Sequence, residues 1–135
     1  MEAARKEKIR ILFTRNLFEG HDIGLRGIVH KCRESGIEVV YYPRFKDFNE
    51  VVKVAEEEDV DIVGISSSSG AHVYLAEGLI SCLRGRGMDI PLIMGGVISD
   101  KDILRLKELG VKGIFGPGST PDEVVSFIFT LLDKH

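Results

Sequence analysis

Five short apolar runs alternate with amphipathic segments of helical period along almost the whole chain. The runs are rich in β-branched residues and nearly continuously apolar, as expected of strands that are buried on both faces of a sheet. They span residues 9–14, 37–42, 60–66, 90–96 and 111–116. Strands that alternate with helices in this way predict an α/β fold, in which one parallel sheet is doubly wound and connected by right-handed crossovers.

The intervening segments have the apolar spacing of helices that pack against a sheet. The expected apolar stripes consist of Phe48, Val51, Val52 and Ala55 in the second helix, and of Ile103, Leu104, Leu106 and Leu109 in the fourth. Gly110 is a candidate C-cap, and Ser119 or Thr120 is a candidate N-cap in front of Pro121. The strand number favours a flavodoxin-like (Rossmann-like) sheet of order 2-1-3-4-5 with helices on both faces.

Length and charge limit the classes of function. The 135 residues predict one domain over residues 9–135, preceded by a tail of residues 1–8. The net charge of −3, with both signs scattered, argues against nucleic acid or a membrane surface as partner. No apolar run approaches the roughly 18 residues of a membrane span, and no signal peptide is apparent, so we expect a cytoplasmic protein. The two cysteines, Cys32 and Cys82, are expected to be small buried residues.

In the predicted topology, the chain reverses direction between the first and third strands, and ligands bind outside the carboxyl ends of these strands. The loop after the first strand is "NLFEGHDIG" (16–24), and the loop after the third is "SSSSGAH" (66–72). We therefore expect these two loops to face one another at a ligand site.

The predicted carboxyl edge of the sheet is rich in glycine and serine. Glycine lets the backbone approach a ligand closely or adopt a positive φ. The residues of this kind are Gly20, Gly24, Ser66, Ser67, Ser68, Gly70, Gly95, Gly96, Gly116 and Gly118. Neither G-x-x-x-x-G-K-[ST] nor a G-x-G-x-x-G after the first strand is present, so the pattern indicates a bed for a large, flat ligand rather than a phosphate cradle alone.

His21 is the candidate metal ligand in this edge. Glu19 is placed to accept a hydrogen bond from one ring nitrogen, which would leave the other nitrogen free for a metal. One histidine is too few for zinc, which needs three or four ligands, but it suffices as an axial ligand to a metal already held by a macrocycle. From spacing alone, an ordinary loop histidine remains an alternative.

The segment "EGHDIG" resembles the D-x-H-x-x-G motif of the cobalamin-binding domains of acyl-CoA mutases, in which "DGHDRG" is usual. That family adds an S-x-L motif after the third strand and G-G after the fourth, which Ser66-Ser67-Ser68 and Gly95-Gly96 match in order and spacing. The ending "GIFGPGS" is similar as well. The chain departs from the family at Glu19, where the family has aspartate, and at Ser68, where it has leucine.

The resemblance implies that adenosylcobalamin is bound base-off. In that mode the dimethylbenzimidazole tail leaves the cobalt and threads between the sheet and the first helix, and His21 becomes the lower axial cobalt ligand. Ser66 would bond the base of the tail, and Gly24, Gly95 and Gly96 would leave room for the nucleotide. The implied cofactor-binding set is Glu19, Gly20, His21, Asp22, Ile23, Gly24, Ser66, Ser67, Ser68, Gly70, Gly95, Gly96, Val97, Gly116, Pro117, Gly118 and Ser119.

By the same resemblance, the chain is the small subunit of an isomerase that carries out radical carbon-skeleton rearrangements of acyl-CoA substrates. A substrate barrel of about 250 residues cannot be formed by this chain, so a separate large subunit is the implied partner, and no catalytic residue is expected on this chain alone. The alternative is a corrinoid carrier for methyl transfer, although such carriers usually have an N-terminal helical cap. A phosphorelay receiver is disfavoured because Ser66 stands where the acceptor aspartate would be.

Three further predictions concern single side chains near this edge or in the core. His72 is expected at a solvated helix start, with a role beside the site or at an interface as the alternative. Phe18, in the loop of His21, could pack against the corrin or fold over the site in its empty state. The remaining prediction is that four phenylalanines belong to the core: Phe13, Phe115, Phe127 and Phe129.

Overall fold

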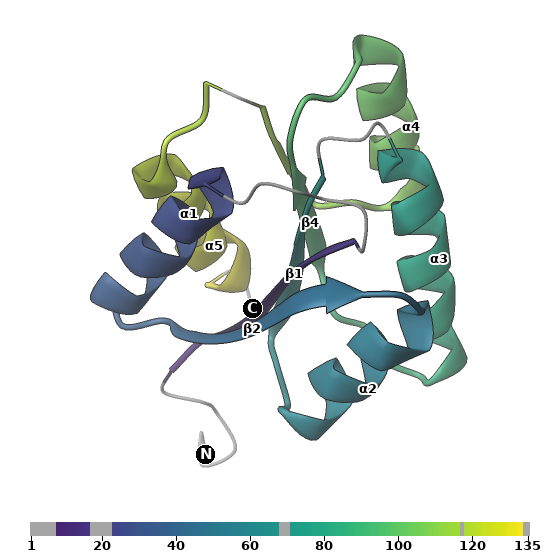
Figure 1. The fold of residues 1–135 in the computed structure, drawn as a ribbon, viewed down its shortest axis with the longest axis horizontal. Helices are drawn as coiled ribbons and strands as arrows, with labels where there is room; N and C mark the ends of the chain where they lie inside the picture. The colour runs from purple at the N-terminus through teal and green to yellow at the C-terminus, as the bar shows by residue number, and fades with distance from the viewer. Residues whose placement is uncertain (1–7, 17–22, 68–70, 117, 134–135) are drawn as a thin grey trace.

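The computed structural model of the chain describes residues 8–16, 23–67, 71–116 and 118–133. Strands and helices alternate throughout (Figure 1). The strands are β1 (Arg10–Asn16), β2 (Glu38–Phe45), β3 (Ile62–Ser66), β4 (Leu92–Gly95) and β5 (Gly113–Phe115). The helices are α1 (Ile23–Glu34), α2 (Phe48–Glu57), α3 (His72–Gly85), α4 (Asp100–Leu109) and α5 (Pro121–Leu132).

All strand pairs are parallel, and the order is β2-β1-β3-β4-β5, which confirms the predicted topology. The first crossover leads from β1 to β2 at the edge of the sheet, and the next returns past β1 to β3. The carboxyl ends of β1 and β3 are therefore neighbours, and Arg15 pairs with Ser66 there. This is the switch point at which the sequence places the ligand site.

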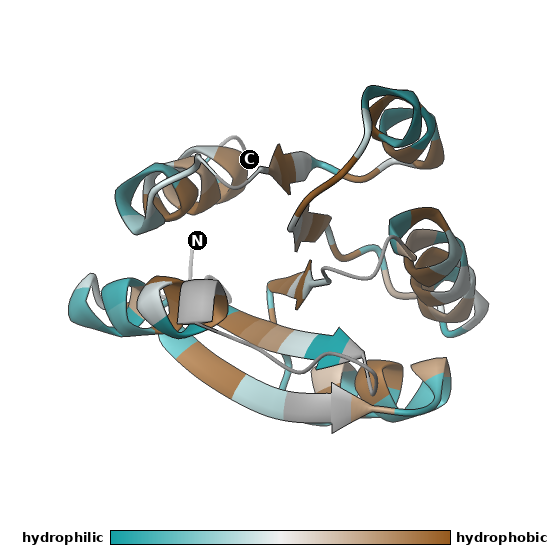
Figure 2. Cartoon of the chain, turned by 45° about the horizontal axis from the view of Figure 1, so that its top comes forward, coloured by the Kyte–Doolittle hydropathy of each residue, from teal (hydrophilic) through white to brown (hydrophobic). Residues whose placement is uncertain are grey.

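Two hydrophobic cores lie on opposite faces of the sheet. Helices α1 and α5 cover one face, and α2, α3 and α4 cover the other (Figure 1). Hydrophobic residues gather in the strands and on the helix sides that face them, with hydrophilic residues outward (Figure 2). Both faces of the central strands are therefore buried, which explains their nearly continuous apolar runs.

Several helix ends follow the predicted capping residues. Thr120, rather than Ser119, is the N-cap of α5: its side chain accepts from the backbone N–H of Glu123, whose carboxylate accepts from the N–H of Thr120. Pro121 occupies the first helical position, where its missing N–H costs nothing. Gly110 ends α4 in the left-handed conformation, as predicted.

Strand boundaries differ from the predicted ones at the edges of the sheet. β2 continues past Tyr42 to Phe45, because Phe45 is buried and the strand gains one extra residue opposite β1 between these positions. β2 is an edge strand, which tolerates Pro43 without its N–H. The fourth and fifth strands are shorter than the apolar runs that announced them.

Two predicted core residues are exposed. Leu104 of α4 is 66% accessible and Phe129 of α5 is 37% accessible, so both predictions were wrong. Phe13 is buried, and Phe115 and Phe127 are partly buried against the same core. Cys32 is fully buried, and burial raises the pKa of its thiol to about 11, in accord with the predicted structural role.

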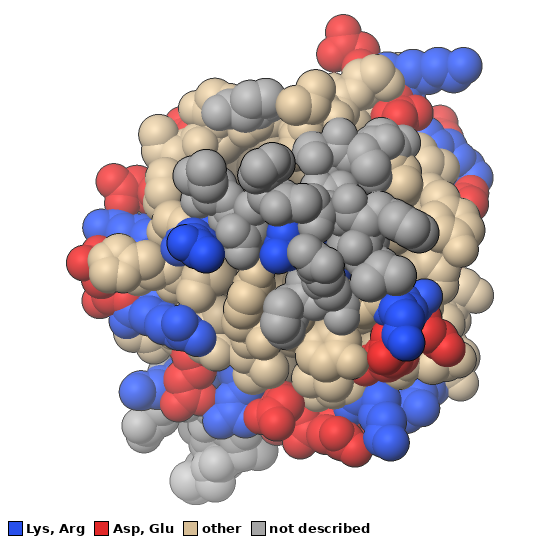
Figure 3. Space-filling view, viewed as in Figure 1, with Lys and Arg blue, Asp and Glu red and all other residues tan. Residues whose placement is uncertain are grey.

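Charged residues of both signs are interspersed around the rim of the face shown in Figure 3. Several pairs join neighbouring helices, such as Lys31 with Asp122 between α1 and α5, whose nitrogen and oxygen are 3.1 Å apart. The hydrogen bond to Asp122 raises the pKa of the Lys31 amine. Within the described part of the chain, none of the helices is both long and apolar enough to cross a membrane.

Candidate functional site

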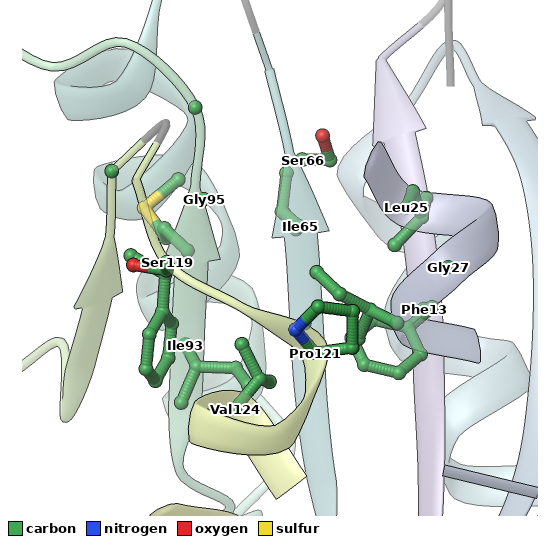
Figure 4. A pocket seen from close by; sticks show the side chains of 16 residues that line it. Phe13, Leu25, Gly27, Ile65, Ser66, Ile93, Gly95, Ser119, Pro121 and Val124 are labelled. Atoms are coloured by element: carbon green, nitrogen blue, oxygen red, sulfur yellow. The ribbon is translucent and has the colours of Figure 1, made fainter. Parts of the chain in front are cut away.

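A pocket of about 330 Å³ opens between the carboxyl half of the sheet and the helices α1 and α5 (Figure 4). Its floor consists of strand residues, and its walls are the first turns of the two helices. The lining residues are Phe13, Leu25, Gly27, Ile28, Gly64, Ile65, Ser66, Ile93, Met94, Gly95, Gly96, Phe115, Gly116, Ser119, Pro121 and Val124. Among the described lining residues, the polar groups apart from the backbone are the hydroxyls of Ser66 and Ser119, which suits a flat, mainly apolar ligand.

Gly64 shapes the floor of the pocket. A β-carbon at this position would lie 2.6 Å from Cε1 of Phe13 and 3.4 Å from Cγ1 of Ile93. Because Phe13 is itself buried, it has little room to move away. The absence of a side chain in the middle of β3 therefore lets the Phe13 ring occupy that space at the pocket floor.

Gly27 lies where the two helical walls of the pocket meet. It lies in α1, and a β-carbon there would be 3.7 Å from Cγ of Pro121 at the start of α5, which is an ordinary contact distance. Leu25 and Gly27 reach the pocket from α1, and Pro121 and Val124 reach it from α5 (Figure 4). Gly27 thus keeps space open in a helix wall without being required by the packing.

The turn after β4 forms the rim of the pocket. Gly96 has a φ of +128°, and a β-carbon on it would overlap the backbone oxygen of Ser67. The N–H of Ser67 donates to the carbonyl of Gly95 over 3.1 Å, and the N–H of Gly96 donates to the carbonyl of Phe115 over 3.0 Å. The ends of β3, β4 and β5 are joined through these two glycines.

His72 takes part in the same junction. Its side chain is fully buried, and its Nε2 lies 3.1 Å from the carbonyl oxygen of Gly95. The expectation of a solvated helix start was therefore wrong. The first turn of α3 packs its His72 side inward against the glycine turn, where a β-carbon on Gly96 would lie 3.0 Å from Nε2 of His72.

The structure brings together part of the predicted cofactor-binding set. Ser66, Gly95, Gly96, Gly116 and Ser119 line the pocket, whereas Ser67 is buried behind it. Val97 is 66% accessible, and Val97 and Gly118 are not among the lining residues. Ile23 and Gly24 begin α1. The predicted residues that lie outside the described ones are Glu19, Gly20, His21, Asp22, Ser68, Gly70 and Pro117, and Phe18 lies there too.

Reasoning from sequence missed most of the pocket wall. Phe13, Leu25, Ile93 and Val124 look like ordinary core residues in the sequence, and no local signal distinguishes them. Two glycines did offer a signal: Gly64 interrupts a strand, and Gly27 interrupts an amphipathic helix. An isolated glycine within such an element often marks a close approach.

The part of the chain that the structure describes contains no cluster of three or more His, Cys, Asp or Glu side chains suited to a metal ion. The described residues thus offer a pocket for an organic group, and the predicted cobalt ligand His21 lies outside them.

A family model described as the B12 binding domain matches residues 9–126. The chain is 35% identical to the pivalyl-CoA mutase small subunit of Xanthobacter autotrophicus, over 93% of this chain and 85% of that protein. It is 31% identical to the 2-hydroxyisobutanoyl-CoA mutase small subunit of Aquincola tertiaricarbonis, over 92% of each. It is also 35% identical to methylmalonyl-CoA mutase of Escherichia coli, of which it spans 18%.

Solved structures share the fold at lower sequence identity. A cobalamin-binding protein from Desulfitobacterium hafniense has a TM-score of 0.77 at 19% identity, over 92% of this chain and 59% of that one. The methanol:cobalamin methyltransferase complex MtaBC of Methanosarcina barkeri gives 0.76 at 16% identity, over 93% and 47%. A receiver domain of NarL from Mycobacterium tuberculosis gives 0.69 at 15% identity, over 96% and 100%. Since receivers and cobalamin proteins both match, these likenesses show the flavodoxin-like fold alone.

Proposed function

Because the chain belongs to the family of B12-binding domains, we propose that it is the cobalamin-binding small subunit of a two-subunit acyl-CoA mutase. Two relatives that it matches over more than nine tenths of its length are named as small subunits of such mutases. The observation that carries the proposal is the pocket at the switch point, which lies between α1 and the carboxyl half of the sheet.

The pocket suits the nucleotide tail of cobalamin. Its volume of about 330 Å³ lies near the lower end of small-molecule sites, so it can take the tail but not the corrin ring as well. Phe13, Ile93 and Phe115 offer an apolar surface to an aromatic base, and the hydroxyls of Ser66 and Ser119 can bond its polar atoms. We infer that the cofactor binds base-off, with the tail in this pocket.

His21 is proposed as the lower axial ligand of the cobalt. The support is the "EGHDIG" segment, in which Glu19 can hold one ring nitrogen of His21 while the other faces the metal. The adenosyl form is the proposed cofactor, since bound adenosylcobalamin supplies a cobalt–carbon bond that breaks homolytically, which is how acyl-CoA mutases begin their rearrangements. This chain's own residues bind and orient the cofactor, and its apolar pocket keeps water from the tail.

A large subunit with the acyl-CoA site is the proposed partner. The match to the Escherichia coli mutase covers only 18% of that protein, so most of that protein has no counterpart in this chain. We infer that activity requires the second subunit, and that the chain contributes the cofactor rather than a catalytic side chain.

Titration with adenosylcobalamin tests the proposal. Because the imidazole of His21 would replace the benzimidazole as a nitrogen ligand, the purified chain is expected to retain the corrinoid with the absorbance of a nitrogen-ligated form after free cofactor is removed by dialysis. Adenosylcobinamide, which lacks the nucleotide tail, should bind more weakly. Equal affinity for the two corrinoids, or loss of the corrinoid on dialysis, would rule out the tail pocket. Transfer of a methyl group from bound methylcobalamin to an acceptor, without mutase activity beside the large subunit, would favour the corrinoid carrier instead.

Substitutions at Gly27 should separate pocket space from stability. Gly27→Ala is expected to raise the free energy of unfolding by about 0.5–1 kcal/mol, because glycine is unfavourable inside a helix and the new methyl group meets Pro121 at an ordinary distance. Gly27→Leu should occupy pocket space and weaken adenosylcobalamin binding about tenfold. The measurements are urea denaturation and the absorbance titration.

Gly85→Ala is the matched control, since Gly85 lies at the end of α3 and a β-carbon there meets nothing within 4 Å. It should leave the affinity for adenosylcobalamin unchanged. The affinity of Gly27→Leu for adenosylcobinamide should also be unchanged. If Gly27→Leu bound adenosylcobalamin with unchanged affinity, the tail would not be bound in this pocket.

A further inference from the structure

His72 is an energetically costly choice for the position it occupies. It is the first residue on the buried stripe of α3, which continues through Leu75, Ala76 and Leu79. The side chain is fully buried, and its Nδ1 has no hydrogen-bond partner among the described residues. A buried polar atom without a partner is destabilising, and an apolar side chain of similar size would avoid that cost. Packing alone therefore does not explain a histidine here.

The other ring nitrogen makes one specific contact. Nε2 lies 3.1 Å from the carbonyl oxygen of Gly95. A carbonyl oxygen can only accept, so Nε2 carries a hydrogen and donates it. Gly95 thereby accepts two hydrogen bonds, one from His72 and one from the N–H of Ser67, and both of its lone pairs are used.

This contact acts on the rim of the pocket. Gly95 and Gly96 have no side chains with which to anchor the turn, and both line the pocket. The plane of the Gly95–Gly96 peptide is held on one side by His72 and Ser67, and on the other by the bond from Gly96 N–H to Phe115. His72 itself is not among the residues that line the pocket, so it can act on a ligand only through this turn.

We propose that His72 is a positioning residue for the nucleotide tail of cobalamin: it fixes the Gly95–Gly96 turn from behind and so sets the shape of the tail pocket. This inference rests on the proposed function, since the tail is the ligand whose pocket the turn borders. It assigns to His72 a role in recognising the tail and none in binding the corrin ring.

A matched pair of variants isolates the Nε2 donor. His72→Gln keeps an N–H donor on an unbranched side chain, and His72→Met has a similar length and no donor. In the protein without cofactor, His72 of the wild type should give the nitrogen-15 shifts of the Nε2–H tautomer. The amide hydrogen of Gly96 should exchange about tenfold faster in His72→Met than in the wild type, and His72→Gln should restore its protection.

Binding measurements then test the positioning role. His72→Met should weaken adenosylcobalamin binding about tenfold while leaving adenosylcobinamide binding unchanged, and His72→Gln should recover most of the loss. Leu79→Ala, in the same helix and core but away from the turn, should destabilise the protein without this selectivity.

Each outcome has a distinct meaning. Equal loss for both corrinoids in His72→Met, no loss for either, or the same selectivity in Leu79→Ala would overturn the positioning role and leave the proposed function standing. Failure of the wild-type protein to bind adenosylcobalamin at all would overturn the proposed function, and the role of His72 in tail recognition with it.

Discussion

Gly96→Ala is expected to lower the free energy of unfolding by about 4 kcal/mol or more, the largest stability effect of any substitution considered for this chain. Two independent costs add at this position. The φ of +128° is one that residues with a β-carbon rarely adopt. The new β-carbon would also overlap the backbone oxygen of Ser67. Because that oxygen belongs to the main chain at the end of β3, it cannot be relieved by a change of rotamer.

Two other glycines separate these costs. Gly110 has a φ of +103°, but a β-carbon there would meet nothing within 4 Å, so Gly110→Ala should cost only the conformational part, about 1–2 kcal/mol. Gly116 borders the same pocket, and a β-carbon there meets nothing within 4 Å, so Gly116→Ala should stay within about 0.5 kcal/mol of the wild type. Urea denaturation of the protein without cofactor measures all three. A Gly96→Ala protein no less stable than Gly110→Ala would contradict the close approach to Ser67.

The sequence was sufficient to predict the sheet order and the helices, since the apolar spacing, the capping residues and the alternation of strands with helices all indicate the same fold. Val51, Val52 and Ala55 of α2 are buried as their spacing predicted, and Thr120 and Gly110 cap helices as their chemistry predicted. Local pattern and global fold point the same way at these positions.

The errors at Leu104 and Phe129 have a common physical cause. Periodicity gives the direction of an apolar stripe, but not the width of the surface that it will meet. β5 has three residues and lies at the edge of the sheet, so the helices beside it have a narrow surface to cover. α4 buries only Leu106 fully, whereas Leu109 is partly buried against the same core and Leu104 is exposed.

The candidate site likewise has one part that could be predicted from the sequence and one part that could not. Its rim could be predicted, because Ser66 and Gly95 end strands, Gly96 follows one, and the carboxyl ends of parallel strands meet at one edge. Its wall could not, because Phe13 and Val124 come together only through the packing of β1 against α5. His72 was misjudged since a sequence does not tell how closely a helix start approaches a neighbouring turn.

His21→Ala is expected to have the largest effect on cofactor binding. Loss of an outer partner of a metal ligand typically costs 10–100-fold in affinity, so loss of the proposed ligand itself should cost about 100-fold or more. Glu19→Gln removes only the carboxylate that is proposed to hold the imidazole, and about a tenfold loss is expected for it. His30→Ala is the control, since His30 is an exposed histidine of α1 that pairs with Glu34.

Electron paramagnetic resonance of the bound cobalt(II) corrinoid identifies the axial atom directly. In uniformly nitrogen-15-labelled protein, a histidine ligand splits each cobalt line into a doublet, whereas the unlabelled benzimidazole of the cofactor gives a triplet. The wild type and His30→Ala should give the doublet, and His21→Ala should not. A triplet in the wild type would mean that the cofactor keeps its own base on the cobalt, and the tail would then be unavailable to the pocket between α1 and the sheet. The axial ligand and the pocket are thus linked: the base can occupy the space beside Phe13 and Ser66 only if it has left the metal, and its departure leaves an axial position that the imidazole of His21 can take.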